Sequence, residues 1–138
     1  MFIRRENFKQ YISFYPVVST LLAINIIVYF ITLIPGIGRE IFNWGASVNI
    51  LIAYGEWWRV VTSIFLHGSF THILFNAFSL FVFAPDLERL MGKWRFIIIY
   101  FASGLAGNIL TYIVHDPTYA SVGASGAIFG VFGAFAAL

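Results

Sequence analysis

Residues 17–34, VVSTLLAINIIVYFITLI, form an apolar run that contains no charged residue. As a helix this run would rise about 27 Å, close to the roughly 30 Å hydrocarbon core of a bilayer. Pro35 and Gly36 follow directly and end the segment. A cleavable signal peptide is the alternative, but the run is long and lacks a small-x-small cleavage site. We therefore expect a permanent membrane span here.

The composition of the whole chain also favours a protein embedded in lipid. Of its 138 residues, 60% are hydrophobic and 10% are charged, and the mean hydropathy is +0.87. Soluble domains usually carry about 25% charged residues, and so short a chain cannot bury this much apolar surface in one core. A net charge of +2 without a basic stripe argues against a nucleic-acid partner. The absence of Cys excludes a disulfide framework and a thiolate metal site, and we expect no cofactor and no metal.

Three further apolar segments predict an all-α protein, a polytopic transmembrane helix bundle that forms one domain over residues 1–138. These segments cover residues 71–90, 95–114 and 125–138. The last one would rise only about 21 Å as a helix, which is too short to cross a bilayer. We therefore expect the sequence to stop inside its fourth transmembrane helix.

The basic residues predict how the bundle is oriented. Six of the eight Lys and Arg residues precede the first span or separate the second from the third: Arg4, Arg5, Lys9, Arg89, Lys93 and Arg95. The positive-inside rule makes that side cytoplasmic. We expect residues 1–16 inside, residues 36–70 and 115–124 outside, and the protein as a whole in the plasma membrane.

The outer segment 36–70 is unusually aromatic for a loop. It carries Trp44, Trp57 and Trp58 among apolar residues, with several glycines as breaks. Tryptophan favours the membrane interface, where its ring is buried and its N–H group meets water. We expect a structured element lying partly in the outer leaflet, and a poorly formed fifth span is the alternative.

Polar side chains at membrane depth are costly, so each needs a reason. His72 and Asn76 are four residues apart, which places them on the same face of a helix that enters from the outer side. Ser125 begins another helix that enters from outside, so topology brings the three to similar depth. His72 and Asn76 can form hydrogen bonds that hold neighbouring helices together. Alternatively, they can be the donors of an oxyanion hole beside a serine nucleophile. A metal site with His67 has little support, because no HExxH motif is present.

Ser125 lies in the string Gly123-Ala124-Ser125-Gly126, at the point where a loop becomes a helix. This string is not the G-x-S-x-G elbow of soluble hydrolases, because the last position is Ala127. Free backbone N–H groups at a helix start can hold an oxyanion. The helix then shows small residues at every fourth position, a pattern that lets neighbouring backbones approach closely.

Taken together, these residues resemble the rhomboid family of intramembrane serine proteases over roughly residues 17–138. The resemblance rests on four motifs: Trp58-Arg59 in the outer loop, His72-x-x-x-Asn76 on the second helix, Glu88-Arg89 at its cytoplasmic end, and Gly123-x-Ser125-Gly126 on the fourth helix. None of these motifs is specific for the family alone, but the four motifs together, at compatible spacing, are specific for it.

The resemblance implies a six-helix core that cleaves transmembrane substrates within or near the membrane. Ser125 would be the nucleophile, and its backbone N–H would form the oxyanion hole with the His72 and Asn76 side chains. Phe129 occupies the place of the aromatic residue that packs against the catalytic imidazole in this family. The remaining motif residues would have supporting roles: Gly123, Gly126, Trp58, Arg59 and Glu88.

The family's general base is a histidine on the sixth helix, and no such helix is present in this sequence. We expect His67 to be a local structural residue and His115 to lie in a solvated turn. A serine without an adjacent base is a weak nucleophile, so these 138 residues are expected to be inactive alone. The resemblance implies that the missing helices supply this histidine and so complete a Ser-His dyad. These helices could also belong to a separate fragment.

Two classes of partner follow from the resemblance, namely the lipid bilayer and transmembrane protein substrates. A substrate helix must unwind before its peptide bond reaches Ser125, which predicts a preference for Gly or Pro near the cut. The alternative function is a catalytically inactive relative that binds transmembrane helices. A transporter has little support, because the apolar stretches, up to Ala84 in the second one, contain no acidic residue and no inverted repeat is visible.

Overall fold

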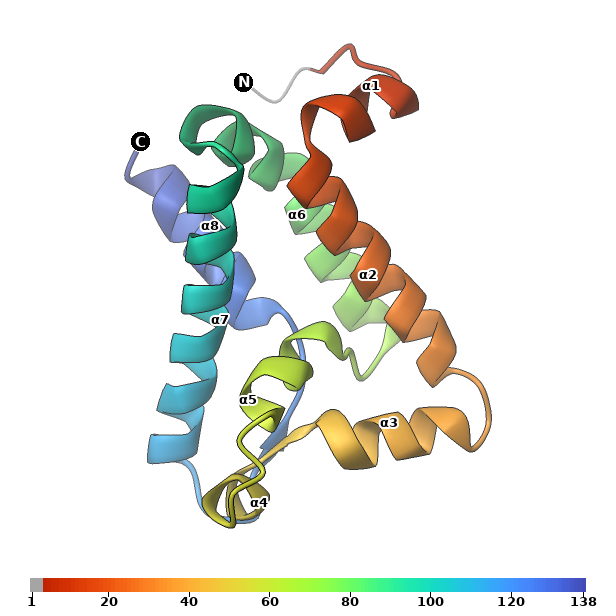
Figure 1. Ribbon diagram of the computed structural model, residues 1–138, viewed down its shortest axis with the longest axis vertical. Helices are drawn as coiled ribbons and strands as arrows, with labels where there is room; N and C mark the ends of the chain where they lie inside the picture. The colour runs from red at the N-terminus through yellow and green to blue at the C-terminus, as the bar shows by residue number, and fades with distance from the viewer. Residues whose placement is uncertain (1–3) are drawn as a thin grey trace.

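The computed structural model describes residues 4–138 and is mostly helical. In chain order its elements are α1 (Phe8–Phe14), α2 (Pro16–Thr32), α3 (Ile37–Gly45), β1 (Ser47–Val48), α4 (Asn49–Ala53), α5 (Arg59–Thr62), η1 (Ser63–Phe65), α6 (Phe70–Met91), α7 (Lys93–Val114), β2 (Ala120–Ser121) and α8 (Ser125–Ala136). The long helices α2, α6 and α7 form a bundle with α8, and the short elements α3, α4 and α5 gather towards one end of it (Figure 1).

Length and composition identify the helices that can cross a membrane. Helices α6 and α7 have 22 residues each and are apolar enough to span a bilayer. Helices α1 and α2 pass the same test together as one span broken by a bend of 111°, and α8 is a shorter apolar helix. The chain is therefore a helical membrane protein. Residues 36–70 contain no helix of spanning length; they form a series of short elements.

Helix α2 begins at Pro16 because a carboxylate from another helix caps it. Glu88, near the end of α6, accepts hydrogen bonds from the backbone N–H groups of Val17 and Val18, both at 2.9 Å. These N–H groups have no partner within their own helix, and a negative charge at a helix N-terminus is favourable. Glu88 is itself buried, so this contact joins α2 to α6 at the end opposite Ser125.

Pro85 interrupts the hydrogen bonding of α6 and thereby provides a binding point for the N-terminal segment. Proline has no N–H, so the carbonyl of Phe81 four residues earlier loses its helical partner. That carbonyl instead accepts a hydrogen bond from the Tyr11 hydroxyl at 3.0 Å. Arg4 donates to the next carbonyl, that of Val82, at 2.6 Å. The proline thus helps to attach α1 and the residues before it to α6.

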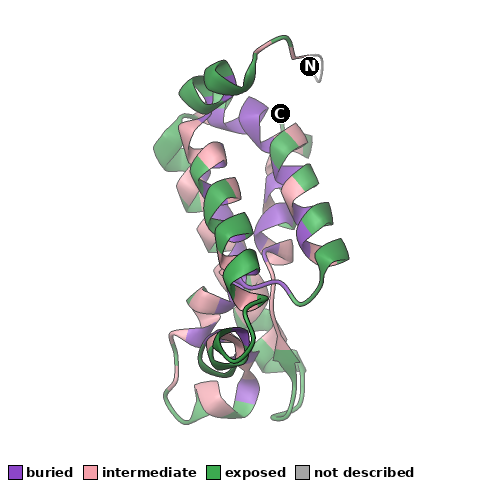
Figure 2. Cartoon of the chain, turned by 90° about the vertical axis from the view of Figure 1, so that its right-hand side faces the viewer, coloured by how far each residue is buried: buried purple, intermediate pink, exposed green. Residues whose placement is uncertain are grey.

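Helices α7 and α8 pack closely through small residues. A Cβ added at Gly130 would overlap the side chain of Ser103, and one at Gly107 would lie 3.5 Å from the Cα of Gly126. Apolar side chains from all the long helices complete the core, including Val18, Leu80, Leu87, Phe96, Tyr100, Ile128 and Val131. Exposed residues cover much of the outer surface of these helices, as a membrane-embedded bundle requires (Figure 2).

A short antiparallel ladder connects the outer loop to the segment before α8. Ser47 pairs with Ser121 and Val48 pairs with Ala120. The N–H of Asn49 extends the connection by donating to the carbonyl of Tyr119 at 3.1 Å. This ladder holds the approach to Ser125 against the aromatic outer loop.

Candidate active site

Ser125 is the first residue of α8, and the loop before it is anchored to the rest of the outer region. The N–H of Gly123 donates to the carbonyl of Ser63 at 2.8 Å. Gly123 has φ +123°, a backbone conformation that a residue with a side chain rarely adopts. The serine therefore lies at a helix start, where the first N–H groups have no intrahelical partner and favour negative charge.

His72 meets Ser125 directly. Its Nε2 atom lies 3.1 Å from the Ser125 hydroxyl oxygen, within hydrogen-bond distance. His72 is in the first turn of α6, whose N-cap residue Ser69 accepts a hydrogen bond from the His72 backbone N–H at 3.2 Å. The α6 and α8 helices thus contribute one side chain each to a serine–histidine pair.

Gly123 makes room for this histidine. A Cβ at Gly123 would overlap Cε1 and Nε2 of the His72 ring. The glycine of the Gly-x-Ser-Gly string is therefore required for close approach as well as for its positive φ. The sequence predicted only a supporting role for Gly123.

Asn76 follows His72 by one helical turn and is 2% exposed. Its amide nitrogen is buried and has no hydrogen-bond partner among the described residues. A buried donor without a partner costs stability. The Asn76 amide N–H group can therefore donate a hydrogen bond to an oxygen atom of a ligand.

His67 also belongs to this cluster, although the sequence predicted a purely local role for it. Its ring lies edge-to-face with that of His72, with centroids 5.1 Å apart and an interplanar angle of 67°. His67 is 1% exposed, and neither ring nitrogen has a hydrogen-bond partner in the part of the chain that the structure describes. Burial, with a smaller contribution from the neighbouring His72, lowers the pKa of His67 to about 4.

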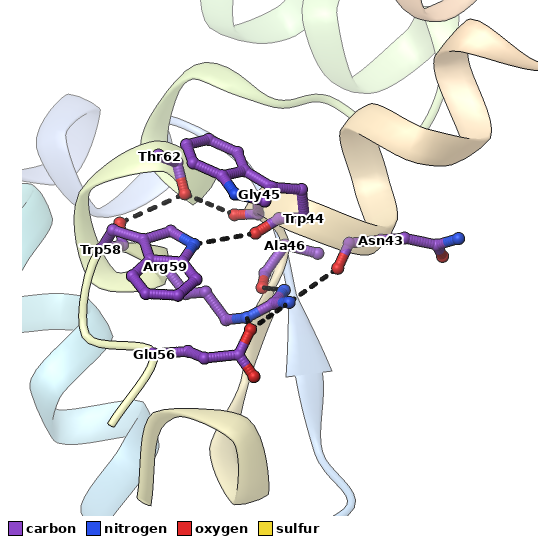
Figure 3. Close-up of polar contacts among 8 residues, drawn as sticks. All are labelled: Asn43, Trp44, Gly45, Ala46, Glu56, Trp58, Arg59 and Thr62. Atoms are coloured by element: carbon purple, nitrogen blue, oxygen red, sulfur yellow. Dashed lines mark hydrogen bonds and ion pairs between the residues drawn. The ribbon is translucent and has the colours of Figure 1, made fainter. Parts of the chain in front are cut away.

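The Trp58-Arg59 motif organises the outer loop (Figure 3). Arg59 is buried and donates to the carbonyls of Ala46 and Asn43 at 2.8 and 2.7 Å, and to the Glu56 carboxylate at 2.9 Å. The Trp58 indole donates to the carbonyl of Trp44 at 3.1 Å and stacks on the Trp44 ring. We name this group of residues 43–46, 56, 58, 59 and 62 the Arg59 clasp; it holds the end of α3 against α5.

Three other predicted residues lie apart from the Ser125–His72 pair. Glu88 is at the opposite end of α6, where it caps α2. Gly126 faces α7, because a Cβ there would lie 3.5 Å from the Ser103 carbonyl oxygen. Phe129, one turn after the serine, is 70% exposed and makes an edge contact with Phe132.

Sequence reasoning missed Asn108 and Ser63. The Asn108 amide, on α7, donates to the carbonyl of Val60 at 2.7 Å and to the Ser63 hydroxyl at 3.1 Å. The Ser63 carbonyl in turn accepts the Gly123 N–H, so these contacts link α7 to the loop before Ser125. An asparagine inside the apolar run of residues 95–114 was a usable signal, because polar side chains at membrane depth need partners.

Ser125 and His72 thus form a serine–histidine pair at a helix N-terminus inside a helical membrane bundle. The rhomboid-domain family model matches residues 54–138. YdcA of Bacillus subtilis (strain 168), which is named as a rhomboid protease, is 48% identical to this chain over 138 residues. The matched region covers 98% of this chain and 68% of YdcA. The chain belongs to the rhomboid family.

Two further relatives extend this comparison. Rhomboid protease GluP of Bacillus subtilis (strain 168) is 42% identical over 116 residues, which are 82% of this chain and 22% of GluP. Rhomboid protease AarA of Providencia stuartii is 35% identical over 131 residues, covering 81% of this chain and 47% of AarA. The chain thus spans less than half of these two proteins. Rhomboid proteases are serine peptidases that act in membranes.

Proposed function

We propose that this protein is an intramembrane serine endopeptidase that cleaves transmembrane-helix substrates, with Ser125 as its nucleophile. The observation that carries the proposal is the 3.1 Å contact between His72 Nε2 and the Ser125 hydroxyl at the start of α8. The unpartnered Asn76 amide on the same face of α6 supports it.

The chemistry follows from these positions. The Ser125 oxygen attacks the substrate carbonyl carbon, its proton passes to a general base, and the carbonyl oxygen becomes an oxyanion. Three donors would stabilise that oxyanion: the Ser125 backbone N–H, the Nε2–H of His72 and the amide of Asn76. Collapse of the intermediate expels the amine and leaves an acyl-serine, which water then hydrolyses.

The family resemblance assigns the general base to a histidine on a sixth helix, in a Ser-His dyad. We propose that further helices of this kind complete the site, either in the same chain or as a separate fragment. Without those helices, residues 1–138 would be inactive, because a serine without an adjacent base is a weak nucleophile. The same resemblance and the basic residues favour the plasma membrane, with the N-terminus in the cytoplasm.

The test compares single-serine variants of the full-length protein in liposomes with a transmembrane substrate that has Gly or Pro near the cut. Ser125→Ala is expected to reduce cleavage to background. The matched control is Ser121→Ala, which removes a hydroxyl from β2, four residues away, and is expected to retain cleavage. Equal cleavage by Ser125→Ala and the unaltered protein would refute the nucleophile assignment. Substrate binding without any cleavage would instead favour the inactive helix-binding relative.

A further inference from the structure

His67 is the buried polar residue next to Ser125 that the proposed chemistry does not use. Buried polar groups in proteins are nearly always hydrogen-bonded, yet both ring nitrogens of His67 have no partner among residues 4–138. Because these nitrogens are unpaired, any role of His67 beside Ser125 depends on the packing of its ring. That ring contacts the ring of His72.

The His72 ring is confined by its neighbours. His67 packs edge-to-face against it at 5.1 Å, which is within the favourable range for ring pairs. The backbone of Gly123 approaches so closely that any side chain there would overlap the His72 ring. Between these contacts, Nε2 of His72 lies within hydrogen-bond distance of Ser125.

We propose that His67 is a positioning residue, which holds the His72 imidazole in the orientation that directs Nε2 towards the site of the oxyanion. This inference rests on the proposed function. Catalysis depends on such orientation, because a displacement of about 1 Å can lower a rate roughly 100-fold. The low pKa of His67 keeps its ring neutral at physiological pH, so the two histidines pack without like-charge repulsion.

The test uses two variants of similar volume. His67→Phe keeps an aromatic ring that can pack edge-to-face on His72, whereas His67→Leu fills the space without a ring. Phe is expected to keep kcat within about threefold, and Leu is expected to lower kcat roughly 10- to 100-fold with KM unchanged. Full kcat in the Leu variant would overturn the inference, and so would an equal loss in both. His115→Leu, at the histidine in the outer loop after α7, is the control and is expected to have no effect.

A double-mutant cycle separates positioning from general damage. In a His72→Ala background, His67→Leu is expected to cause no further loss of kcat, because its effect passes through His72. Independent, additive losses would overturn the inference. A second measurement follows the side-chain ¹⁵N signals of His72, which should broaden or shift in the Leu variant and stay unchanged in the Phe variant.

The two proposals fail in different ways. If Ser125→Ala cleaves as well as the unaltered protein, the proposed function is wrong. If Ser125 is essential but His67→Leu retains full kcat, only the positioning role is wrong.

Discussion

The Arg59 clasp and the Ser125 site are polar clusters that each contain buried side chains, namely Arg59 in the first and His67 and Asn76 in the second, but they differ in how completely these side chains are paired. In the clasp, all three guanidinium nitrogens of Arg59 donate to backbone carbonyls or to Glu56. At the serine, the Asn76 amide nitrogen and both His67 ring nitrogens have no partner among the described residues.

This difference in pairing suggests that the clasp serves the stability of the fold and that the site serves catalysis. A fully paired buried network stabilises a fold and defines a single arrangement of the backbone. An unpaired buried donor destabilises the fold, and at a reaction site a ligand or reaction intermediate can supply its partner. Variants of the clasp should therefore change stability, and variants of the site should change rate.

The largest expected effect is that of Asn76→Ala on catalysis. Loss of one oxyanion-hole donor typically lowers kcat by about 10²–10³, while the thermal stability should stay nearly unchanged, because the amide nitrogen makes no hydrogen bond. The measurement is kcat in liposomes alongside the melting temperature. Asn49→Ala is the matched control: its amide donates to the Asp116 carbonyl, so it should lower stability and leave kcat intact. An unchanged rate in Asn76→Ala would return Asn76 to a structural role.

Arg59→Met should show the opposite pattern. The substitution leaves the carbonyls of Ala46 and Asn43 and the Glu56 carboxylate without their donor, which we expect to cost about 3 kcal/mol of unfolding free energy. Cleavage per folded molecule should fall much less than stability does. Denaturant titration in detergent, combined with active-site counting, measures both quantities. A loss below 1 kcal/mol would show that the clasp is dispensable for the fold.

The smallest effect concerns pH. The folded pKa of His67 is lowered to about 4 from its ordinary 6.5, so between these values the unfolded chain binds a proton that the folded one does not. This contribution to stability is full above pH 6.5 and declines as the pH falls towards 4. His67→Phe removes it while His72 remains in both proteins. The melting temperature of the unaltered protein should therefore fall more steeply between pH 7 and pH 5 than that of the variant, and parallel curves would contradict the assignment.

The long helices could be predicted from the sequence because they follow from local properties. Helix α6 begins after Ser69, which caps it, and ends at Gly92, whose φ is +85°. Between them lies a predominantly apolar segment that is poorly soluble in water. The polar residues inside such runs stood out for the same reason, and they led to His72 and Asn76.

The clasp could not be predicted in this way. Arg59 binds carbonyls 13 and 16 residues earlier in the chain, and backbone carbonyls are the same for every residue type. Only the path of the chain decides which of them meet the guanidinium. The helices α3 to α5 are likewise too short to show a clear helical periodicity of apolar residues. The sequence therefore predicted a structured loop but not the individual helices within it.

The sequence by itself determined that this chain is a helical membrane protein and that Ser125, His72 and Asn76 are its candidate site. The first conclusion depends on burial cost, which each residue carries with it, and the second rests also on the resemblance to the rhomboid motifs. Only the tertiary structure decided which polar groups meet. The Ser125–His72 contact requires α6 and α8 to approach closely at Gly123, and the place of His67 beside His72 depends on the turn into α6. The Ser125–His72 contact joins residues 53 positions apart in the chain, for which no local pattern exists.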